Sequence, residues 1–122
     1  MNITKVHYNP ADQVTIKAAA DLVAGQFVVI TGEMDGRNPV AGVADAGVVP
    51  FGVAAHDCPA GEHVMVYRSG HIVDVTASAA INAGANVSTA SGGKAVTAAT
   101  GPVAGIALTK GTAGNPVTVA LT

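Results

Sequence analysis

The sequence predicts an all-β fold, a small single-domain β-sandwich or barrel. The first observation behind this prediction is a five-residue unit, Ala-Gly-x-x-Val, that occurs four times. In three copies the valine opens or continues an apolar or alternating run, which is typical of a turn that leads into a β-strand. Glycine can adopt the positive φ that such a turn needs, and valine suits a half-buried strand. We therefore expect structural turns at the four glycines of the unit, Gly25, Gly61, Gly84 and Gly114.

The second observation is the composition. Of the 122 residues, 49% are hydrophobic and 11% are charged, and none is Trp. This length predicts one domain that buries roughly two-thirds of its unfolded surface. The dominant Val, Ala and Thr side chains bury little area each, so the core must consist of many small contacts. The charges are too few to cover a monomer in the usual way, which predicts an oligomer or a permanently docked subunit.

The chain opens with a segment that we interpret as an N-terminal arm, residues 1–13, containing the turn signal Asn9-Pro10. The arm has no apolar stretch of the kind that marks a secretory signal. It is either a frayed terminus or a segment that orders against a partner. The β-rich domain is expected to occupy residues 14–122.

Alternation in Val14-Thr15-Ile16-Lys17 predicts the first strand of that domain. The Ala-rich stretch 18–22 is too short for a stable helix, so we expect a turn with at most one helical turn there. A loop is predicted at residues 32–39, and further strands are predicted at residues 27–31, at 40–47 with a closing turn, and at 50–57.

A β-hairpin is predicted around Arg68-Ser69-Gly70, because residues 64–67 and 71–75 flank this turn signal as two apolar runs. With Ser69 and Gly70 as the loop residues, Val66 would lie opposite Val73 and Tyr67 opposite Ile72.

An internal repeat is predicted from two sequence shifts. A shift of 59 maps residues 24–28 onto 83–87, and a shift of 53 maps 52–54 onto 105–107 and 60–66 onto 113–119. A rival match of 39–44 with 102–107 breaks this register, and Ala and Gly are common enough for chance matches. We expect two pseudo-repeated halves, about 19–75 and 76–122. Alternating apolar positions near the C-terminus argue against a disordered tail.

The charge pattern excludes several classes of partner. The net charge is −2 and the six Lys and Arg residues are scattered, so no basic stripe is present to bind nucleic acid. The sequence contains no run of about 18 apolar residues, so no membrane span is predicted. The single cysteine, Cys58, cannot form an internal disulfide, which fits assembly in a reducing cytoplasm.

No metal site is predicted. His56 and Cys58 would share one face of a strand, but zinc needs at least one more convergent ligand. His63 and His71 flank the predicted hairpin and could approach each other, although histidines at strand ends are usually solvated.

No catalytic site, cofactor or small-molecule substrate is predicted either. Ser69-Gly70-His71 places a hydroxyl beside an imidazole but lacks an evident orienting acid. Glu33 and Asp35 share a predicted loop, and we expect them to lie at its solvent-exposed tip. The segment around them is superficially similar to the hairpin of biotinyl and lipoyl carrier domains, but its tip has no lysine to carry the cofactor.

Several motifs together resemble the capsid decoration, or cement, proteins of tailed bacteriophages. The resemblance covers roughly residues 14–122, and its motifs lie at residues 49–57, 60–66, 69–70, 79–87, 92–94 and 102–108. It implies a β-tulip-like fold and a non-enzymatic virion protein that is made in the host cytoplasm. As the resemblance implies, this protein would bind the outer capsid surface as a homotrimer and brace subunits of the major capsid protein.

We expect residues 1–17 to reach the capsid, with a strand added to the edge of a capsid sheet. The predicted capsid-contacting residues are Ile3, Lys5, His7, Tyr8, Val14 and Ile16. The alternative is a phage fibre or adhesin-type module that recognises a host receptor or glycan. With two Tyr and no Trp, the chain offers few stacking platforms for sugars. An enzyme is the third and least favoured class.

Overall fold

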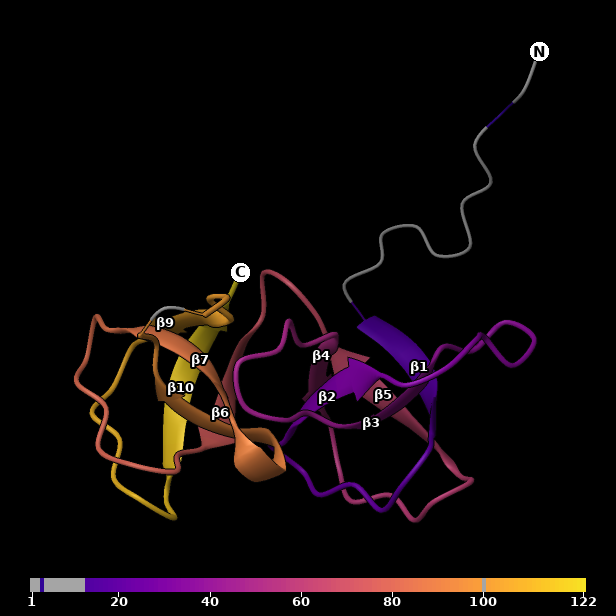
Figure 1. The fold of residues 1–122 in the computed structure, drawn as a ribbon, viewed down its shortest axis with the longest axis horizontal. Coiled ribbons are helices and arrows are strands. Elements are labelled where there is room, and N and C mark those ends of the chain that lie inside the picture. The colour runs from indigo at the N-terminus through magenta and orange to yellow at the C-terminus, as the bar shows by residue number, and fades with distance from the viewer. Residues whose placement is uncertain (1–2, 4–12, 100) are drawn as a thin grey trace.

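Two five-stranded β-sheets lie side by side in the computed structural model, which describes residues 3, 13–99 and 101–122 (Figure 1). The first sheet is a closed barrel in the order β1-β3-β2-β4-β5. Its strands are β1 (Gln13–Ala18), β2 (Phe27–Ile30), β3 (Val40–Val43), β4 (Gly52–Ala54) and β5 (His63–Tyr67). The prediction of an all-β, barrel-like fold is confirmed.

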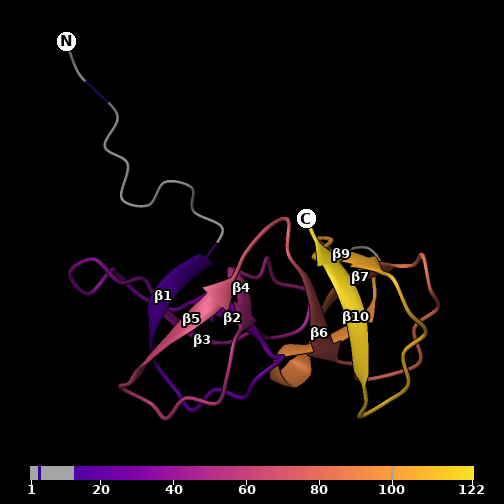
Figure 2. The same cartoon turned by 180° about the vertical axis from the view of Figure 1, so that it is seen from behind.

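The second sheet has the order β6-β10-β9-β7-β8 and follows the barrel in sequence. Its strands are β6 (Ile72–Thr76), β7 (Asn86–Ala90), β8 (Lys94–Thr97), β9 (Gly105–Ala107) and β10 (Pro116–Leu121), with a 3-10 turn at Ser91–Gly93 between β7 and β8. Seen from behind, β10 runs across the front of this sheet (Figure 2).

Strand pairing repeats between the two sheets. β1 pairs with β5 as β6 pairs with β10, and β2 joins β3 and β4 as β7 joins β8 and β9. The isolated bridge Leu22–Cys58 has its counterpart in the bridge Ile81–Gly111. The shift of 59 relates Leu22 to Ile81, and the shift of 53 relates Cys58 to Gly111. Sequence duplication with halves 19–75 and 76–122 stays a prediction. The repeated pairing starts at Gln13 and again at Ile72, so a boundary at 75 and 76 would cut β6.

The four glycines of the repeated unit all adopt positive φ. Their φ angles are 76° at Gly25, 87° at Gly61, 85° at Gly84 and 80° at Gly114. Each glycine stands two residues before the first residue of a strand, β2, β5, β7 or β10. The unit is therefore a strand-entry turn in a conformation that residues with a β-carbon rarely adopt.

One core cluster fills the barrel and consists of small and branched side chains: Val14, Ile16, Ala18, Leu22, Val28, Ala41, Ala54, Cys58, Val64 and Val66. Alternation along the strands determines which residues enter the barrel core, because Val28 and Ala54 point inward while their neighbours Phe27 and Val53 point outward. The outward residues are not solvated, since they belong to the second core cluster.

That second cluster joins the two halves. Phe27, Ala44 and Val53 of the barrel pack with buried residues of the second sheet, and we call this contact the seam. Hydrogen bonds follow the same line: Gly93 N donates to Ala44 O at 2.9 Å, and Gln26 Nε2 donates to Gly92 O at 3.0 Å. The seam therefore makes one folding unit of the two sheets.

The predicted hairpin is wrong. β5 pairs with β1 and β4, whereas β6 pairs with β10, so Val66 faces Val14 and Ile72 faces Ala120. The turn itself exists, with φ 92° at Gly70. Turn residues specify a local reversal of the chain, but non-local burial chooses the partner strand, and here each run completes a different sheet.

Strand positions are otherwise close to the prediction. The strands expected from Val14 and from residue 27 are present, while β3 ends at Val43 and the run 50–57 contains only the three-residue β4. Residues 18–22 have no helical turn and end in the bridge at Leu22. A three-residue β4 suffices because both of its edges are paired, with β2 and with β5.

Candidate functional site

His56 and Cys58 do not share a site. The Cys58 side chain is buried in the barrel core, while His56 is exposed and its Nδ1 lies 2.9 Å from the Asp57 carbonyl oxygen. Among the described residues, no group of three His, Cys, Asp or Glu side chains could hold a metal ion. The strand that would have placed both residues on one face ends at Ala54.

Cys58 is poorly suited to nucleophilic chemistry. Burial raises the pKa of its thiol, and the nearby Glu62 and Asp21 raise it further. Because the thiolate is the reactive form, a raised pKa leaves the side chain as a small hydrophobic residue of the core.

The two histidines next to the predicted hairpin stand at different ends of β5. His63 opens the strand opposite Lys17, whereas the His71 ring lies 5.0 Å from the ring of Tyr67, the last residue of the strand. His71 Nδ1 lies 3.1 Å from the Arg68 carbonyl oxygen, and its Nε2 lies 3.4 Å from Gln13 Nε2. Both ring nitrogens therefore lie near polar partners other than Ser69.

Asp35 forms an ion pair in place of a carboxylate pair with Glu33. Lys17 Nζ lies 3.0 Å from Asp35 Oδ2, and this hydrogen bond, together with the lysine charge, lowers the pKa of Asp35 below its ordinary value of 3.8. Both side chains are exposed, so the pair adds little stability. It does connect the middle of the loop at residues 31–39 to β1.

Replacing Lys17 by Met is expected to raise the pKa of Asp35 toward 3.8. The pKa of Asp35 is lower in the folded state than in the unfolded state. The ion pair therefore stabilises the fold at pH values above the unfolded-state pKa of Asp35, and this stabilisation disappears as the pH falls through the folded-state pKa. An NMR titration of the Asp35 carboxyl measures the change, with Lys110→Met as the control. An Asp35 pKa that does not move would show that the pair does not persist in solution.

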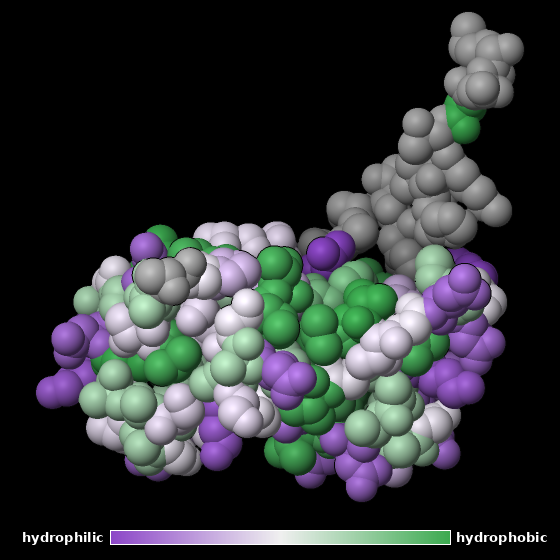
Figure 3. Space-filling view, in the orientation of Figure 1, coloured by the Kyte–Doolittle hydropathy of each residue, from purple (hydrophilic) through white to green (hydrophobic). Residues whose placement is uncertain are grey.

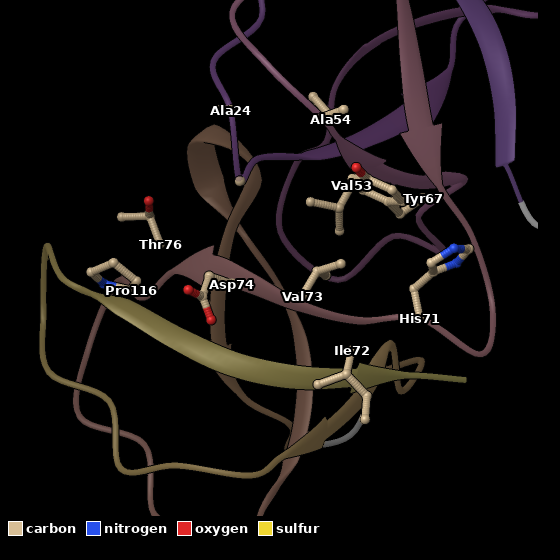
Figure 4. Close-up of a pocket in the computed structure, with 12 residues that line it drawn as sticks. Ala24, Val53, Ala54, Tyr67, His71, Ile72, Val73, Asp74, Thr76 and Pro116 are labelled. Carbon is tan, nitrogen blue, oxygen red and sulfur yellow. The ribbon is translucent and has the colours of Figure 1, made fainter.

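A groove of about 530 Å³ runs between the two halves (Figure 4). Val53 of β4 and Val73 of β6 meet in its middle, with Tyr67 and His71 at one end and Asp74 toward the other. β6 is an edge strand, hydrogen-bonded along β10 on one side and facing the groove on the other. The groove is therefore apolar at its floor and carries no convergent set of polar side chains.

Exposed hydrophobic side chains are the more distinctive surface feature. In the described part of the chain, the exposed large hydrophobic residues are Ile3, Val23, Ile30, Met34, Val49, Ile72, Val103, Ile106 and Leu108. In the view of Figure 3, hydrophobic side chains gather across the middle of the molecule, over the boundary between the halves.

Four of these residues belong to the second sheet, on or next to β6 and β9: Ile72, Val103, Ile106 and Leu108. Ile72 and Ile106 both pair with Ala120 of β10, one from each side. They share the outer surface of the sheet, because the alternate residues Val119 and Val117 point into the core. Leu108 lies two residues after Ile106 and its N–H donates to the Thr118 carbonyl oxygen, so it continues this surface. We call Ile72, Ile106 and Leu108 the apolar face.

The predicted capsid-contacting residues have different environments. Ile3 is 84% exposed, whereas Val14 and Ile16 are 2% and 0% exposed because they alternate into the barrel core. Lys5, His7 and Tyr8 lie outside the described residues. Sequence reasoning did not single out Ile106, although the match of Val53 with Ile106 under the shift of 53 was a signal for it.

No helix in the described residues is long and apolar enough to cross a membrane. No curated protein sequence matches the chain. Among solved structures, the chain resembles the crystal structure of the head fiber gp8.5 N base in bacteriophage phi29, with a TM-score of 0.76 and 24% identity over 90% of this chain and 92% of that chain. At this identity the likeness shows the fold alone.

The phage cement protein family model matches residues 6–122, nearly the whole chain. This family is a structural one and not an enzyme family. The protein is therefore a structural component of the phage virion, and it belongs to the phage cement protein family.

Proposed function

We propose that the protein binds the outer surface of the phage head, bridges neighbouring subunits of the major capsid protein and thereby stabilises the shell, without catalysis. Family membership supports association with the head. The observation that carries the bracing role is the exposed apolar face on a weakly charged β-fold. Such a surface can form broad, shallow contacts, and repetition of these contacts over a lattice adds avidity.

The proposal includes a homotrimer made in the host cytoplasm, because a multivalent brace binds several subunits at once. One chain has a mass of 11.9 kDa, and analytical ultracentrifugation is expected to give three times this mass. A stable monomer at micromolar concentration would remove the trimer from the proposal.

The direct test uses purified heads that lack the protein. Added protein is expected to bind them up to a fixed ratio to the major capsid protein and to raise the temperature at which packaged DNA is released. The same heads mixed with an unrelated small β-protein provide the control. Saturable binding that leaves the release temperature unchanged would limit the function to attachment.

The N-terminal residues 1–10 are proposed to carry part of the attachment, since β1 itself is integrated into the barrel through β5. Deleting residues 1–10 is expected to abolish binding to heads and to leave the circular dichroism spectrum and unfolding transition unchanged. Wild-type occupancy of the heads by the truncated protein would contradict this role.

A second candidate function is a fibre or adhesin-type module. It is favoured by the likeness to the base of a head fiber, which suggests that this fold can also carry a further structure. Binding to host cells or glycans, compared with binding to empty heads, separates the two functions.

A further inference from the structure

Asp35 is followed by Gly36, and this is the single Asp-Gly pair in the sequence, which contains no Asn-Gly pair. The side-chain carboxyl carbon of an aspartate can be attacked by the main-chain nitrogen of the next residue, and the product is a five-membered cyclic imide. Glycine hinders this attack least, because it has no β-carbon and its backbone is the most adaptable. The sequence therefore points to Asp35 among the aspartates.

Asp35 and Gly36 lie in a tight reverse turn. Asp35 N–H donates to Asn38 O at 2.9 Å and Asn38 N–H donates to Asp35 O at 3.1 Å, so Gly36 and Arg37 are the two central residues. The φ angle is 63° at Gly36, and no described non-glycine residue has positive φ, which is the pattern of a type II′ turn. Within the described part of the chain Gly36 N–H donates no hydrogen bond, so its nitrogen is available for the attack.

Nothing crowds the place where the ring would form. The Asp35 side chain is 60% exposed, and a β-carbon added to Gly36 would meet no atom within 4 Å. Residues 31–37 are all exposed, and the loop between β2 and β3 projects at the end of the molecule away from the second sheet (Figures 1 and 2). The turn can therefore rearrange without disturbing either core cluster.

The other aspartates are less suited to this reaction. The carboxylates of Asp21 and Asp57 each accept a hydrogen bond of 2.9 Å from a main-chain N–H of a distant segment. The residues that follow them, Leu22 and Cys58, are buried. Asp45 is exposed but is followed by an alanine, whose methyl group hinders the attacking nitrogen. Asp35 thus combines exposure with an unhindered neighbour.

Lys17 opposes the reaction through its ion pair with Asp35, in which Nζ lies 3.0 Å from Oδ2. A carboxyl group cyclises far more readily when it is protonated, because its hydroxyl group can then leave as water. The hydrogen bond and the charge of Lys17 lower the pKa of Asp35, and the charge of His63 lowers it further. The ion pair therefore reduces the fraction of Asp35 that can react.

We propose that Asp35 is a site of spontaneous isomerisation to isoaspartate, by ring closure onto Gly36 N, and that Lys17 slows this reaction. Gly36 N forms a bond with Asp35 Cγ, and the amide proton leaves with the carboxyl hydroxyl group as water. Water then reopens the imide. Cleavage between Gly36 N and the Asp35 main-chain carbonyl carbon leaves the chain running through Cβ and Cγ. No atom is gained or lost overall, and nothing is oxidised or reduced.

The product changes the loop but not the core. Isoaspartate adds one carbon atom to the main chain before Gly36 and places the carboxylate directly on the α-carbon of residue 35. The carboxylate is then one carbon closer to the main chain, so we expect the ion pair with Lys17 to be lost. We expect the unfolding transition to be unchanged, because neither core cluster includes a residue of the loop 31–39.

The test ages the purified protein at neutral pH in water enriched in oxygen-18. Trypsin then releases the peptide 18–37, which contains Asp21 and Asp35. A second form of this peptide is expected to elute separately, to carry one oxygen-18 atom and to yield isoaspartate at residue 35 on fragmentation. The peptide that contains Asp45 is the control in the same sample and is expected to stay unlabelled.

Three variants test the roles of the side chains. Asp35→Glu is expected to form no such product, because its ring would have six members and closes more slowly. Lys17→Met is expected to react faster, by about tenfold for each pKa unit by which an NMR titration finds Asp35 raised. Lys110→Met is expected to react at the wild-type rate. Circular dichroism checks that each variant is folded.

The opposite results are equally clear. If the urea-unfolded chain forms isoaspartate at residue 35 and the folded protein does not, the turn prevents the reaction and the inference is overturned. Equal labelling of the peptide that contains Asp45 would remove the selectivity for Asp35. A wild-type rate in Lys17→Met would overturn the role of Lys17. None of these results depends on binding to heads, so the inference and the proposed function fail separately.

Discussion

Phe27→Ala is expected to destabilise the protein by about 3–5 kcal/mol, a large part of the roughly 5–15 kcal/mol that holds a domain of this size together. Phe27 is fully buried and is the largest of the fully buried side chains in the described residues; it belongs to the cluster that forms the seam. Its neighbours there are small, so little can move into the space left by the ring.

Urea unfolding followed by circular dichroism measures this loss. Val23→Ala is the control, because the Val23 side chain is 56% exposed and its truncation should change the free energy of unfolding by no more than about 0.5 kcal/mol. A loss below about 1 kcal/mol for Phe27→Ala would mean that the seam contributes little to stability. Two separate transitions would show that the sheets unfold independently.

Gly105→Ala is expected to cost about 1–3 kcal/mol, by overpacking and not by backbone strain. A β-carbon at Gly105 would collide with the Ala120 carbonyl oxygen and lie 2.7 Å from Val119 Cγ1. The equivalent Gly52 has the same constraint, since its β-carbon would lie 2.5 Å from the Tyr67 carbonyl oxygen. The repeated Gly-[Val/Ile]-Ala pattern is thus explained by close strand packing.

Gly32→Ala provides the matched control for this prediction. A β-carbon at Gly32 would meet no atom within 4 Å, and its φ is not positive, so the substitution is expected to be neutral or stabilising by up to about 1 kcal/mol. Thermal unfolding of the two variants compares them directly. Equal stability of Gly105→Ala and Gly32→Ala would show that β9 and β10 separate easily to admit a methyl group.

Local sequence predicted most of what is local in the structure. The turns at Gly25, Gly61, Gly84 and Gly114 coincide with positive φ, and the alternation from Val14 predicted β1 correctly. Both features depend on only a few neighbouring residues. The same reasoning paired β5 with β6 wrongly, because the partner of a strand depends on residues far away in sequence.

The candidate site, like the fold, was predicted only in its local features. The low charge and the exposed apolar surface could be expected from composition, but the identity of the exposed residues could not. Val53 and Ile106 have similar side chains and equivalent strand positions, yet one is buried and the other is exposed. Val14 and Ile16 were expected at the capsid, but alternation placed their side chains inside the barrel.

By itself the sequence determined the all-β class, the strand-entry turns, the two shifts that relate the halves and the absence of a recognisable catalytic motif. Only the tertiary structure decided that the first sheet closes, that the second stays open at β6 and β8, and that the seam covers one copy of a surface present twice. The physical reason is that turn and strand preferences act over a few residues. Burial of Phe27 and exposure of Ile106, in contrast, depend on which distant surface is available to cover each of them.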